Sequence, residues 1–192
     1  MPVLRWVEAL LGVLPERSDV LELGCGGGSA ATRALALRHR VTGVDLSGVQ
    51  VERARRAVPD ARFIQGDAST VELDPASFDA VVSLFMLGHI PRAEQATLLA
   101  RIAGWLRPGG HALLTLGVGD TPDEVEAEWL GAPMFFASFD ADRNRGMLAT
   151  AGFETIRDRI VPIDEPGHGP VSFQWVLARR PAGSMPRRSP GV

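Results

Sequence analysis

The segment VLELGCGGGSAATRAL, residues 20–35, constrains the fold of this chain more than any other. A short apolar run leads into a glycine-rich loop, and an alanine-rich helical pattern follows directly. Gly24, Gly26 and Gly28 permit positive φ angles and a close backbone approach where the strand becomes a helix. The amides of residues 27–30 would then face an anion at the start of the helix. The segment predicts a strand–loop–helix unit that holds a ligand, although a tight structural turn would use the same glycines.

The spacing of these glycines disfavours two common phosphate-binding loops. The dinucleotide fingerprint G-x-G-x-x-G needs its third glycine at position 29, where this chain has Ser29. A P-loop needs a lysine, and the sequence contains none, because each of its 20 basic residues is an arginine. Both phosphate-binding interpretations are therefore weakened, and with them an NAD-type oxidoreductase.

Short apolar runs alternate with helical patterns, as in folds with a parallel sheet covered by helices on both faces. Strands are predicted at residues 19–23, 40–45, 61–65, 78–84, 111–116, 154–162 and 171–179. Helices are predicted at residues 4–14, 28–37, 48–57, 92–106 and 141–151, with a short one at 122–129. The last two strands form a hairpin, so one of them runs antiparallel to the rest. We expect a single domain over residues 1–180 and a disordered tail over 181–192.

The composition limits the partners and the setting. Hydrophobic residues make up 45% and charged residues 22%, the balance of a soluble globular domain. The net charge of −3 and the lack of a basic stripe argue against a nucleic-acid partner. The sequence shows no signal peptide or membrane span, which predicts a cytoplasmic protein without a membrane partner. Cys25 is the only cysteine, so no intramolecular disulfide can form and no metal site is expected.

Three later motifs indicate the ligand. VTGVDLS, residues 41–47, ends a strand on Asp45, whose carboxylate can accept both hydroxyls of a ribose. QGDAS, residues 65–69, places Asp67 just after the third strand, where it can accept a hydrogen bond from an adenine amino group. WLRPGG, residues 105–110, lies between the long helix and the fifth strand. Together they turn the glycine loop from a moderate signal into a strong one.

With these motifs the chain resembles the class I S-adenosylmethionine-dependent methyltransferases. VLELGCGGG, VTGVDLS, FIQGDAS, FDAVVSLFMLGHI and WLRPGGHALLTL stand in the family's order and spacing, over about residues 6–179. The resemblance implies an α/β fold: a Rossmann-like, doubly wound, seven-stranded and mostly parallel sheet in three layers. Its strand order would be 3-2-1-4-5-7-6, with the last strand antiparallel. It also implies S-adenosyl-L-methionine (SAM) as cofactor and S-adenosyl-L-homocysteine (SAH) as product.

The resemblance further implies roles for individual residues. Glu22 would lie near the ammonium group of the cofactor, Asp45 at the ribose, and Asp67 at the adenine edge. The implied cofactor contacts are Glu22, Gly24, Cys25, Gly26, Gly28, Asp45, Leu46, Gly66, Asp67, Ala68, Ser83 and Leu84. Glu22 could instead cap neighbouring amides, and Cys25 is interpreted as an incidental loop residue without a redox role.

The implied reaction is an in-line displacement, for which the protein mainly positions and desolvates the reactants. A general base is needed only where the nucleophile must lose a proton early. His89, after the fourth strand, and His168, between the last two strands, are the candidate bases, with Asp120 and Asp140 as weaker ones. Two other histidines are expected at the opposite edge of the sheet as structural residues: His39 and His111.

The acceptor is expected to bind at the least family-like segment, residues 117–139, whose aromatic side chains could line an apolar pocket. The candidate substrate-binding residues are Phe85, His89, Trp129, Met134, Phe135 and Phe136. Sealing the edge of the core is an equally good interpretation of each aromatic residue. The [DN]PPY signature of methyltransferases that act on bases or glutamine is replaced by residues 83–86, SLFM, which again disfavours nucleic acid.

The leading hypothesis is a methyltransferase acting on the oxygen, nitrogen or carbon of a small molecule, in specialised-metabolite biosynthesis. The alternative is a catalytically silent regulatory or partner subunit that binds SAM or SAH. Only about four residues precede the first helical pattern, whereas many small-molecule members have additional N-terminal helices that cover the site. The site could be open, covered by a partner subunit as in a homodimer, or the chain could be trimmed.

Overall fold

The computed structural model describes residues 2–129, 131–165 and 169–183, and its main sheet has seven strands in the order β3-β2-β1-β4-β5-β9-β8. These strands are β1 (Asp19–Leu23), β2 (Arg40–Asp45), β3 (Arg62–Gln65), β4 (Phe78–Ser83), β5 (Leu106–Gly117), β8 (Glu154–Glu165) and β9 (Gly169–Arg179). β1 to β5 pair in parallel, and β9 is antiparallel to both of its neighbours. Numbered within this sheet, the order is 3-2-1-4-5-7-6 with the seventh strand antiparallel, which confirms the predicted fold class.

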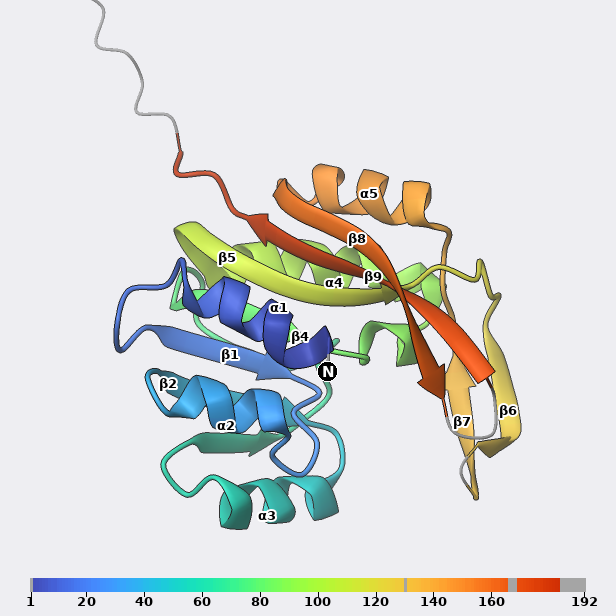
Figure 1. The fold of residues 1–192 in the computed structure, drawn as a ribbon, viewed down its shortest axis with the longest axis horizontal. Helices are drawn as coiled ribbons and strands as arrows, with labels where there is room; N and C mark the ends of the chain where they lie inside the picture. The colour runs from blue at the N-terminus through green and yellow to red at the C-terminus, as the bar shows by residue number, and fades with distance from the viewer. Residues whose placement is uncertain (1, 130, 166–168, 184–192) are drawn as a thin grey trace, which may run out of the picture.

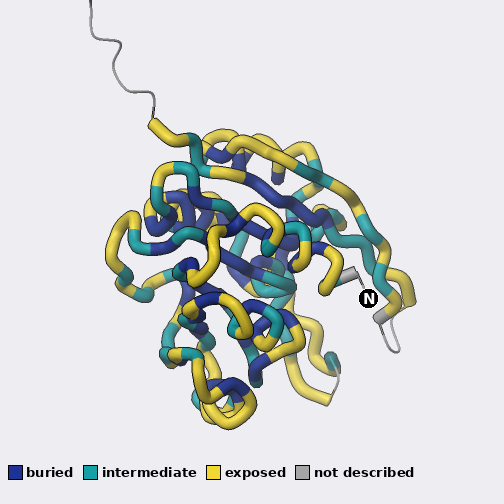
Figure 2. Tube along the Cα trace, turned by 60° about the vertical axis from the view of Figure 1, so that its left-hand side comes forward, coloured by how far each residue is buried: buried dark blue, intermediate teal, exposed yellow. Residues whose placement is uncertain are grey.

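Helices cover both faces of the sheet (Figure 1). They are α1 (Pro2–Leu11), α2 (Ala30–Ala36), α3 (Gly48–Ala57), α4 (Arg92–Trp105), α5 (Ala141–Thr150) and the short 3-10 helix η1 (Leu87–His89). Alternate residues of β1 enter different cores: Val20 packs with α1 and α2, whereas Leu21 and Leu23 pack with α4 and α5. Figure 2 shows this burial along the central strands, with the outer surfaces of the helices exposed. A strand buried on both faces suits the nearly continuous apolar runs of the sequence.

Most predicted boundaries lie within three residues of the observed ones, and the differences have local causes. Helix α2 begins two residues later than predicted, because the positive φ of Gly28 keeps the loop outside the helix. Ser29 is its N-cap and forms a capping box with Thr32. Two further helices begin at a side-chain cap: Ser47 accepts from the amide of Gln50 at the start of α3, and Asp140 accepts from that of Arg143 at the start of α5.

Strand β5 begins five residues earlier than predicted, at Leu106. Residues 107–110, which the sequence placed between the long helix and the fifth strand, belong to this strand, because the segment after β9 continues the pairing. The amide of Gly109 donates to the carbonyl of Arg180 at 2.8 Å, and the amide of Arg180 donates to the carbonyl of Gly110 at 2.8 Å.

The predicted short helix at residues 122–129 is wrong. This segment forms strand β6 (Glu124–Trp129), which pairs with β7 (Ala132–Phe136) in a separate two-stranded sheet. The sequence EVEAEW alternates with a period of two, and the aromatic segment that follows supplies a partner strand, so pairing outweighs the helix propensity of glutamate and alanine. We call β6 and β7 the arm. It stands beyond the carboxyl ends of the parallel strands (Figure 1).

Three predictions concern the limits of the described chain. In the described part, no helix is long and apolar enough to cross a membrane. The expected disordered tail lies mostly outside the described residues, which end at residue 183. His168, one of the two candidate bases, also lies outside them.

Candidate functional site

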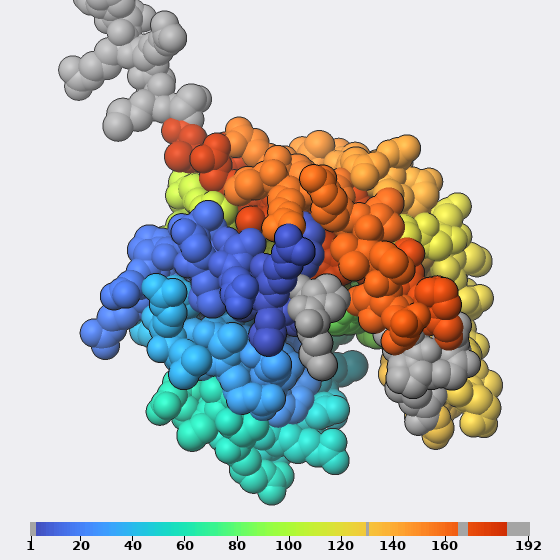
Figure 3. Space-filling model, in the orientation of Figure 1, coloured from blue at the N-terminus to red at the C-terminus, as the bar shows by residue number. Residues whose placement is uncertain are grey.

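A cleft follows the carboxyl ends of β1 to β4 and consists of two adjoining hollows that share four lining residues, Gly24, Gly26, Leu84 and Phe85. The loop hollow, of about 520 Å³, lies between the glycine loop and the first turn of α1. The strand-end hollow, of about 640 Å³, reaches from the ends of β2 and β3 to η1 and the arm. In the space-filling view a gap separates the arm from the body of the molecule (Figure 3).

Every residue predicted to contact the cofactor lines this cleft, except Ser83. Ser83 is fully buried, and its hydroxyl has no hydrogen-bond partner among the described residues. Sequence interpretation did not single out Met86 and Gln50, which also line the strand-end hollow, or Val3 and Leu4, which line the loop hollow. Val3 and Leu4 come from α1, and no local pattern of the sequence ties that helix to the glycine loop.

The glycine loop combines tight packing with an open side. Gly24 has φ +70°, and a Cβ there would lie 2.7 Å from the Cβ of Met86, so only glycine fits. Gly26 has φ +55°, but a Cβ there would meet nothing within 4 Å. The loop is therefore pressed against the β4 end at Gly24 and open at Gly26, where a ligand can approach the backbone.

Asp45 organises the end of β2. One carboxylate oxygen accepts from the amide of Gly26 at 2.8 Å, and the other accepts from the amide of Ser47 at 2.9 Å. A carboxylate offers about four acceptor positions, so each oxygen keeps capacity for a further donor. Asp45 thus joins the glycine loop to β2 and can still accept two vicinal hydroxyl groups.

Glu22 is a buried carboxyl group that lines the loop hollow. Its Oε2 atom has no hydrogen-bond partner among the described residues. Burial raises the pKa of Glu22 to about 7, with a smaller contribution from the charge of Asp45, against the effect of a hydrogen bond from Thr32. An ammonium group would supply both the missing donor and a compensating charge. The site therefore fits the amino-acid end of SAM, and capping of neighbouring amides does not account for the orphan oxygen.

The far end of the cleft offers polar edges and an apolar surface. One oxygen of Asp67 accepts from the amide of Ser69 at 2.8 Å, and the carboxylate is exposed at the rim. Leu46 is 72% exposed, an unusual state for a leucine, and lies beside Asp45 in the lining. A flat aromatic ring resting on Leu46, with its polar edge at Asp67, would use both features.

Cys25 contributes only its backbone. Its side chain packs among Val51, Ala54 and Phe63 on the α3 side of the sheet. Burial raises the pKa of the thiol to about 12, with further contributions from Glu22 and Asp45. A thiol held protonated in this way is unreactive, which agrees with the absence of a predicted redox role.

Phe85 lines both hollows at the point where β4 ends. Its φ of +58° is rare for a bulky residue and costs roughly 1–2 kcal/mol. Its amide donates to the hydroxyl of Thr115, and its ring meets Phe173 and Trp175 edge to face. These contacts hold the strained backbone and direct the ring toward the junction of the two hollows.

His89 lines the strand-end hollow next to the arm. Its Nδ1 lies 2.8 Å from the carbonyl oxygen of Phe135. Because a carbonyl only accepts, Nδ1 carries the proton, and Nε2 is left as an acceptor. The histidine ring also contacts Phe136, at 5.2 Å between centroids. The geometry of His89 therefore suits a base.

The weaker candidate bases have structural roles. Asp120 pairs with Arg92, and Asp140 caps α5. His39 and His111 lie at the amino-terminal side of the sheet, as expected, and burial lowers the pKa of each.

The arm brings only part of the predicted acceptor pocket to the cleft. Among its described residues, Met134 alone lines the strand-end hollow. Trp129 and Phe136 meet edge to face at 4.8 Å, beside His89. Phe135 pairs with Val125, one position out of step with Met134, so its side chain points to the opposite face of the arm.

One residue that sequence reasoning missed, Arg92, fastens both ends of the arm. Its guanidinium donates to the carbonyls of Thr121 and Ser138, pairs with Asp120, and lies 4.6 Å above the ring of Phe139. In the sequence Arg92 is indistinguishable from a solvated residue in the first turn of a helix.

Two buried amides reinforce this anchorage. Gln95 donates to the carbonyls of Ile90 and Ala137, and Asn144 donates to that of Gly117. The sequence could have predicted the burial of Gln95, because this residue lies on the same helical face as the buried Leu99 and Ile102.

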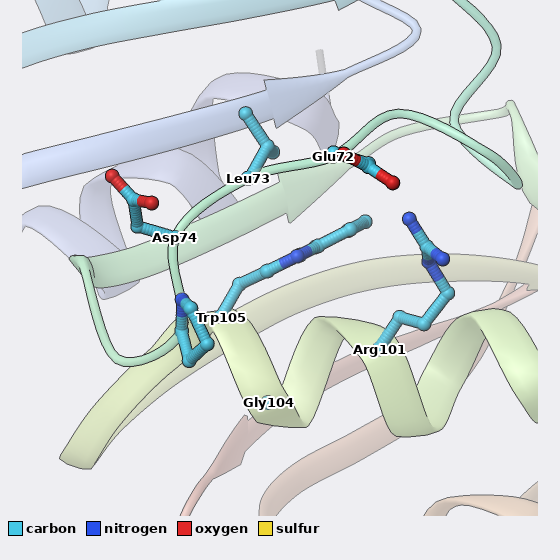
Figure 4. Close-up of a pocket in the computed structure, with 7 residues that line it drawn as sticks. Glu72, Leu73, Asp74, Arg101, Gly104 and Trp105 are labelled. Atoms are coloured by element: carbon cyan, nitrogen blue, oxygen red, sulfur yellow. The ribbon is translucent and has the colours of Figure 1, made fainter.

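A separate hollow of about 610 Å³ lies between the β3–β4 connection and α4 (Figure 4). Arg101 and Trp105 rise from α4 toward the connection that carries Glu72, Leu73 and Asp74. The guanidinium of Arg101 lies 5.1 Å from the centre of the Trp105 ring and donates to the carbonyl of Val71. This hollow shares no lining residue with the cleft.

Comparison with known proteins agrees with the fold. Residues 20–110 match the family described as a methyltransferase domain. The 27-O-demethylrifamycin SV methyltransferase of Amycolatopsis mediterranei is 39% identical over 138 residues, 65% of this chain and 48% of that protein. The fatty-acid O-methyltransferase of Mycolicibacterium smegmatis is 38% identical over 157 residues, 77% of this chain and 56% of that protein. The chain thus spans about half the length of the curated relatives it matches.

Solved structures share the fold. A SAM-dependent methyltransferase from Methanosarcina mazei superposes with a TM-score of 0.79 at 17% identity, over 91% of this chain and 98% of its own. A Burkholderia thailandensis 1,6-didemethyltoxoflavin-N1-methyltransferase with bound SAH superposes with a TM-score of 0.71 at 24% identity. The match covers 93% of this chain and 78% of that protein. The [4+2]-cyclase SpnF superposes with a TM-score of 0.71 at 20% identity. The match covers 93% of this chain and 81% of that protein.

The fold and the motif-bearing cleft define a class I, Rossmann-like methyltransferase domain. The methyltransferase-domain match, the relatives and the solved structures together support a class I SAM-dependent methyltransferase.

Proposed function

We propose that the protein is a SAM-dependent methyltransferase that acts on a small molecule in specialised-metabolite biosynthesis. One observation carries the proposal: a buried carboxyl with an orphan oxygen, Glu22, lies in the same cleft as the glycine loop, Asp45 and Asp67. These are the partners that an ammonium group, a ribose and an adenine require. When bound, SAM supplies a methyl group activated by a positively charged sulfur.

The residues of the cleft would bind and orient the cofactor. Glu22 would hold its ammonium group, Asp45 its ribose hydroxyls, and Asp67 with the backbone of Ala68 its adenine edge. Leu46 would cover the adenine ring. Phe85, at the junction of the two hollows, would exclude water from the reacting atoms.

His89 would accept a proton where the acceptor has one to lose. The carbonyl of Phe135 keeps the proton on Nδ1, so that Nε2 can act as the base. The same hydrogen bond fixes the ring relative to the arm, which would place the base beside the acceptor.

The names of the relatives support a small acceptor, since they refer to a rifamycin and to fatty acids. A catalytically silent, cofactor-binding subunit is the second candidate. The cyclase among the solved structures favours keeping it, because that protein shares the fold and is not named as a methyltransferase.

Calorimetry with SAH and NADH tests the proposal. We expect SAH to bind and NADH not to bind. Asp45→Asn should weaken SAH binding by about 1–3 kcal/mol. The neutral amide replaces a charged acceptor, and its NH2 group would face the ribose hydroxyls or backbone amides that donate to Asp45. Asp74→Asn, in the separate hollow, is the matched control and should leave the affinity unchanged.

Turnover separates the two candidates. A methyltransferase should release SAH from SAM when a deproteinised small-molecule extract of the source cells is added. SAH binding without any release of SAH would favour the silent subunit, and binding of NADH in place of SAH would reject both.

A further inference from the structure

We infer that the methyl acceptor is apolar and carries no negative charge at its reacting end: an alcohol, phenol or amine rather than a carboxylate or phosphate. The inference rests on the proposed function and narrows its substrate class. It sets this chain apart from the fatty-acid O-methyltransferase it resembles, whose named acceptor is a carboxylic acid.

The charges of the cleft are one-sided. The described residues that line the two hollows include the carboxyl groups of Glu22, Asp45 and Asp67, and the titratable ring of His89. They include no arginine, and every basic residue of the chain is an arginine. Since Glu22, Asp45 and Asp67 would hold the cofactor, an acceptor anion would find no arginine to pair with among the described residues of the lining.

Three arginines near the cleft make contacts outside the lining next to His89. Arg33 donates to the carbonyl of Gly28 at 2.7 Å, and Arg53 lies beside Gly27, so both approach the glycine-loop end. Arg92 is at the base of the arm, where it holds two carbonyls and pairs with Asp120. None of them belongs to the lining next to His89.

The arm adds negative charge on the relevant side. Residues directly opposite in an antiparallel pair share a face, and the register pairs Glu124 with Phe136 and Glu126 with Met134. Met134 lines the strand-end hollow, so the face of the arm that carries it also carries the carboxyl group of Glu124.

The remaining lining is apolar. Leu84 and Phe85 lie at the junction of the hollows, Met86 and Met134 lie toward the arm, and Leu4 lies on the α1 side. A carboxylate would lose its hydration here without gaining a compensating charge, whereas a neutral or cationic group on an apolar body would not.

A pair of probes with the same ring tests this. 2-Naphthol is neutral at pH 7.5, and 2-naphthoate is anionic. Each is titrated into the SAH complex and into the complex with sinefungin, whose amine places a positive charge near the methyl position. We expect 2-naphthol to bind about tenfold more tightly in the SAH complex, because naphthoate would lose its hydration in an apolar lining without gaining a compensating cation. In the sinefungin complex the added positive charge should narrow this difference.

Two variants of the arm sharpen the test. Met134→Arg places a cation on the face that lines the hollow and should raise the affinity for 2-naphthoate about tenfold. Val125→Arg is the matched control, because Val125 is 65% exposed and pairs with Phe135 on the opposite face. It should leave both probe affinities unchanged.

The outcomes are distinct. If SAH and sinefungin fail to bind, the proposed function fails, and the inference falls with it. If they bind while 2-naphthoate binds the SAH complex as tightly as 2-naphthol or more tightly, or neither probe binds, the inference alone is overturned.

Discussion

At the scale of single residues, the carboxyl group of Glu22 is held in the folded protein at an electrostatic cost. Its pKa of about 7 lies above the ordinary 4.5 because the side chain is buried and Asp45 is close. The folded state therefore binds this proton more tightly than the unfolded state does. The contribution of Glu22 to the free energy of unfolding therefore falls as the pH rises from 4.5 to 7, by roughly 3 kcal/mol in total.

Glu22→Gln removes the ionisable group and should flatten this pH dependence. Relative to the wild type, the variant should gain on the order of 2–3 kcal/mol of unfolding free energy between pH 4.5 and pH 8. Urea unfolding at several pH values measures the difference. Glu72→Gln, an exposed carboxyl outside the cleft, is the control, and parallel wild-type and Glu22→Gln curves would contradict the expectation.

At the scale of elements, the arm depends on contacts that no local pattern announces. Arg92 joins its two ends, and the hydrogen bonds to Thr121 and Ser138 span 29 and 46 residues of sequence. The helix expected at residues 122–129 failed for the same reason: a partner strand further along the chain decided the conformation of β6. By contrast, the bounds of α3 were predicted correctly, because the helix and its cap at Ser47 are adjacent in sequence.

Arg92→Ala should release the arm while leaving the sheet intact. Trp129 reports its position, since the other three tryptophans, Trp6, Trp105 and Trp175, are at most 5% exposed. We expect greater acrylamide quenching of the Trp129 emission, assigned with a Trp129→Phe variant, and an SAH affinity within about twofold of the wild type, because Arg92 does not line the cleft.

The control for this variant is Arg143→Ala. Arg143 also lies over the ring of Phe139, at 5.7 Å, but in the described contacts its side chain bonds to neither end of the arm. Equal quenching in the two variants would show that Arg92 does not hold the arm.

At the scale of the whole molecule, the parallel order of β1 to β4 collects the site. The strands all end at one edge, which brings Glu22, Asp45, Asp67 and Leu84 to one cleft although they span more than 60 residues of sequence. Ligand at this edge would bridge four strands and stabilise the domain as a unit.

SAH should therefore raise the melting temperature in one cooperative transition. At a hundredfold excess over its dissociation constant it adds about 2.7 kcal/mol, or roughly 5–10 °C for a domain of this size. Differential scanning calorimetry measures both the shift and the number of transitions. NADH should give no shift, and two separately shifting transitions would contradict a single domain.

The sequence by itself determined the alternation of strands and helices and the ligand-bearing edge of the sheet. These follow from short-range signals: glycine spacing, carboxylates at strand ends and helix caps all act within a few residues. The sheet order and most of the cleft lining came from the family that the motifs resemble. Tertiary structure alone decided the rest. The arm, its attachment through Arg92, the contact of α1 with the glycine loop and the burial of Glu22 without a partner for Oε2 depend on segments far apart in the chain. Their energies come from packing and desolvation, which the linear order of residues does not encode locally.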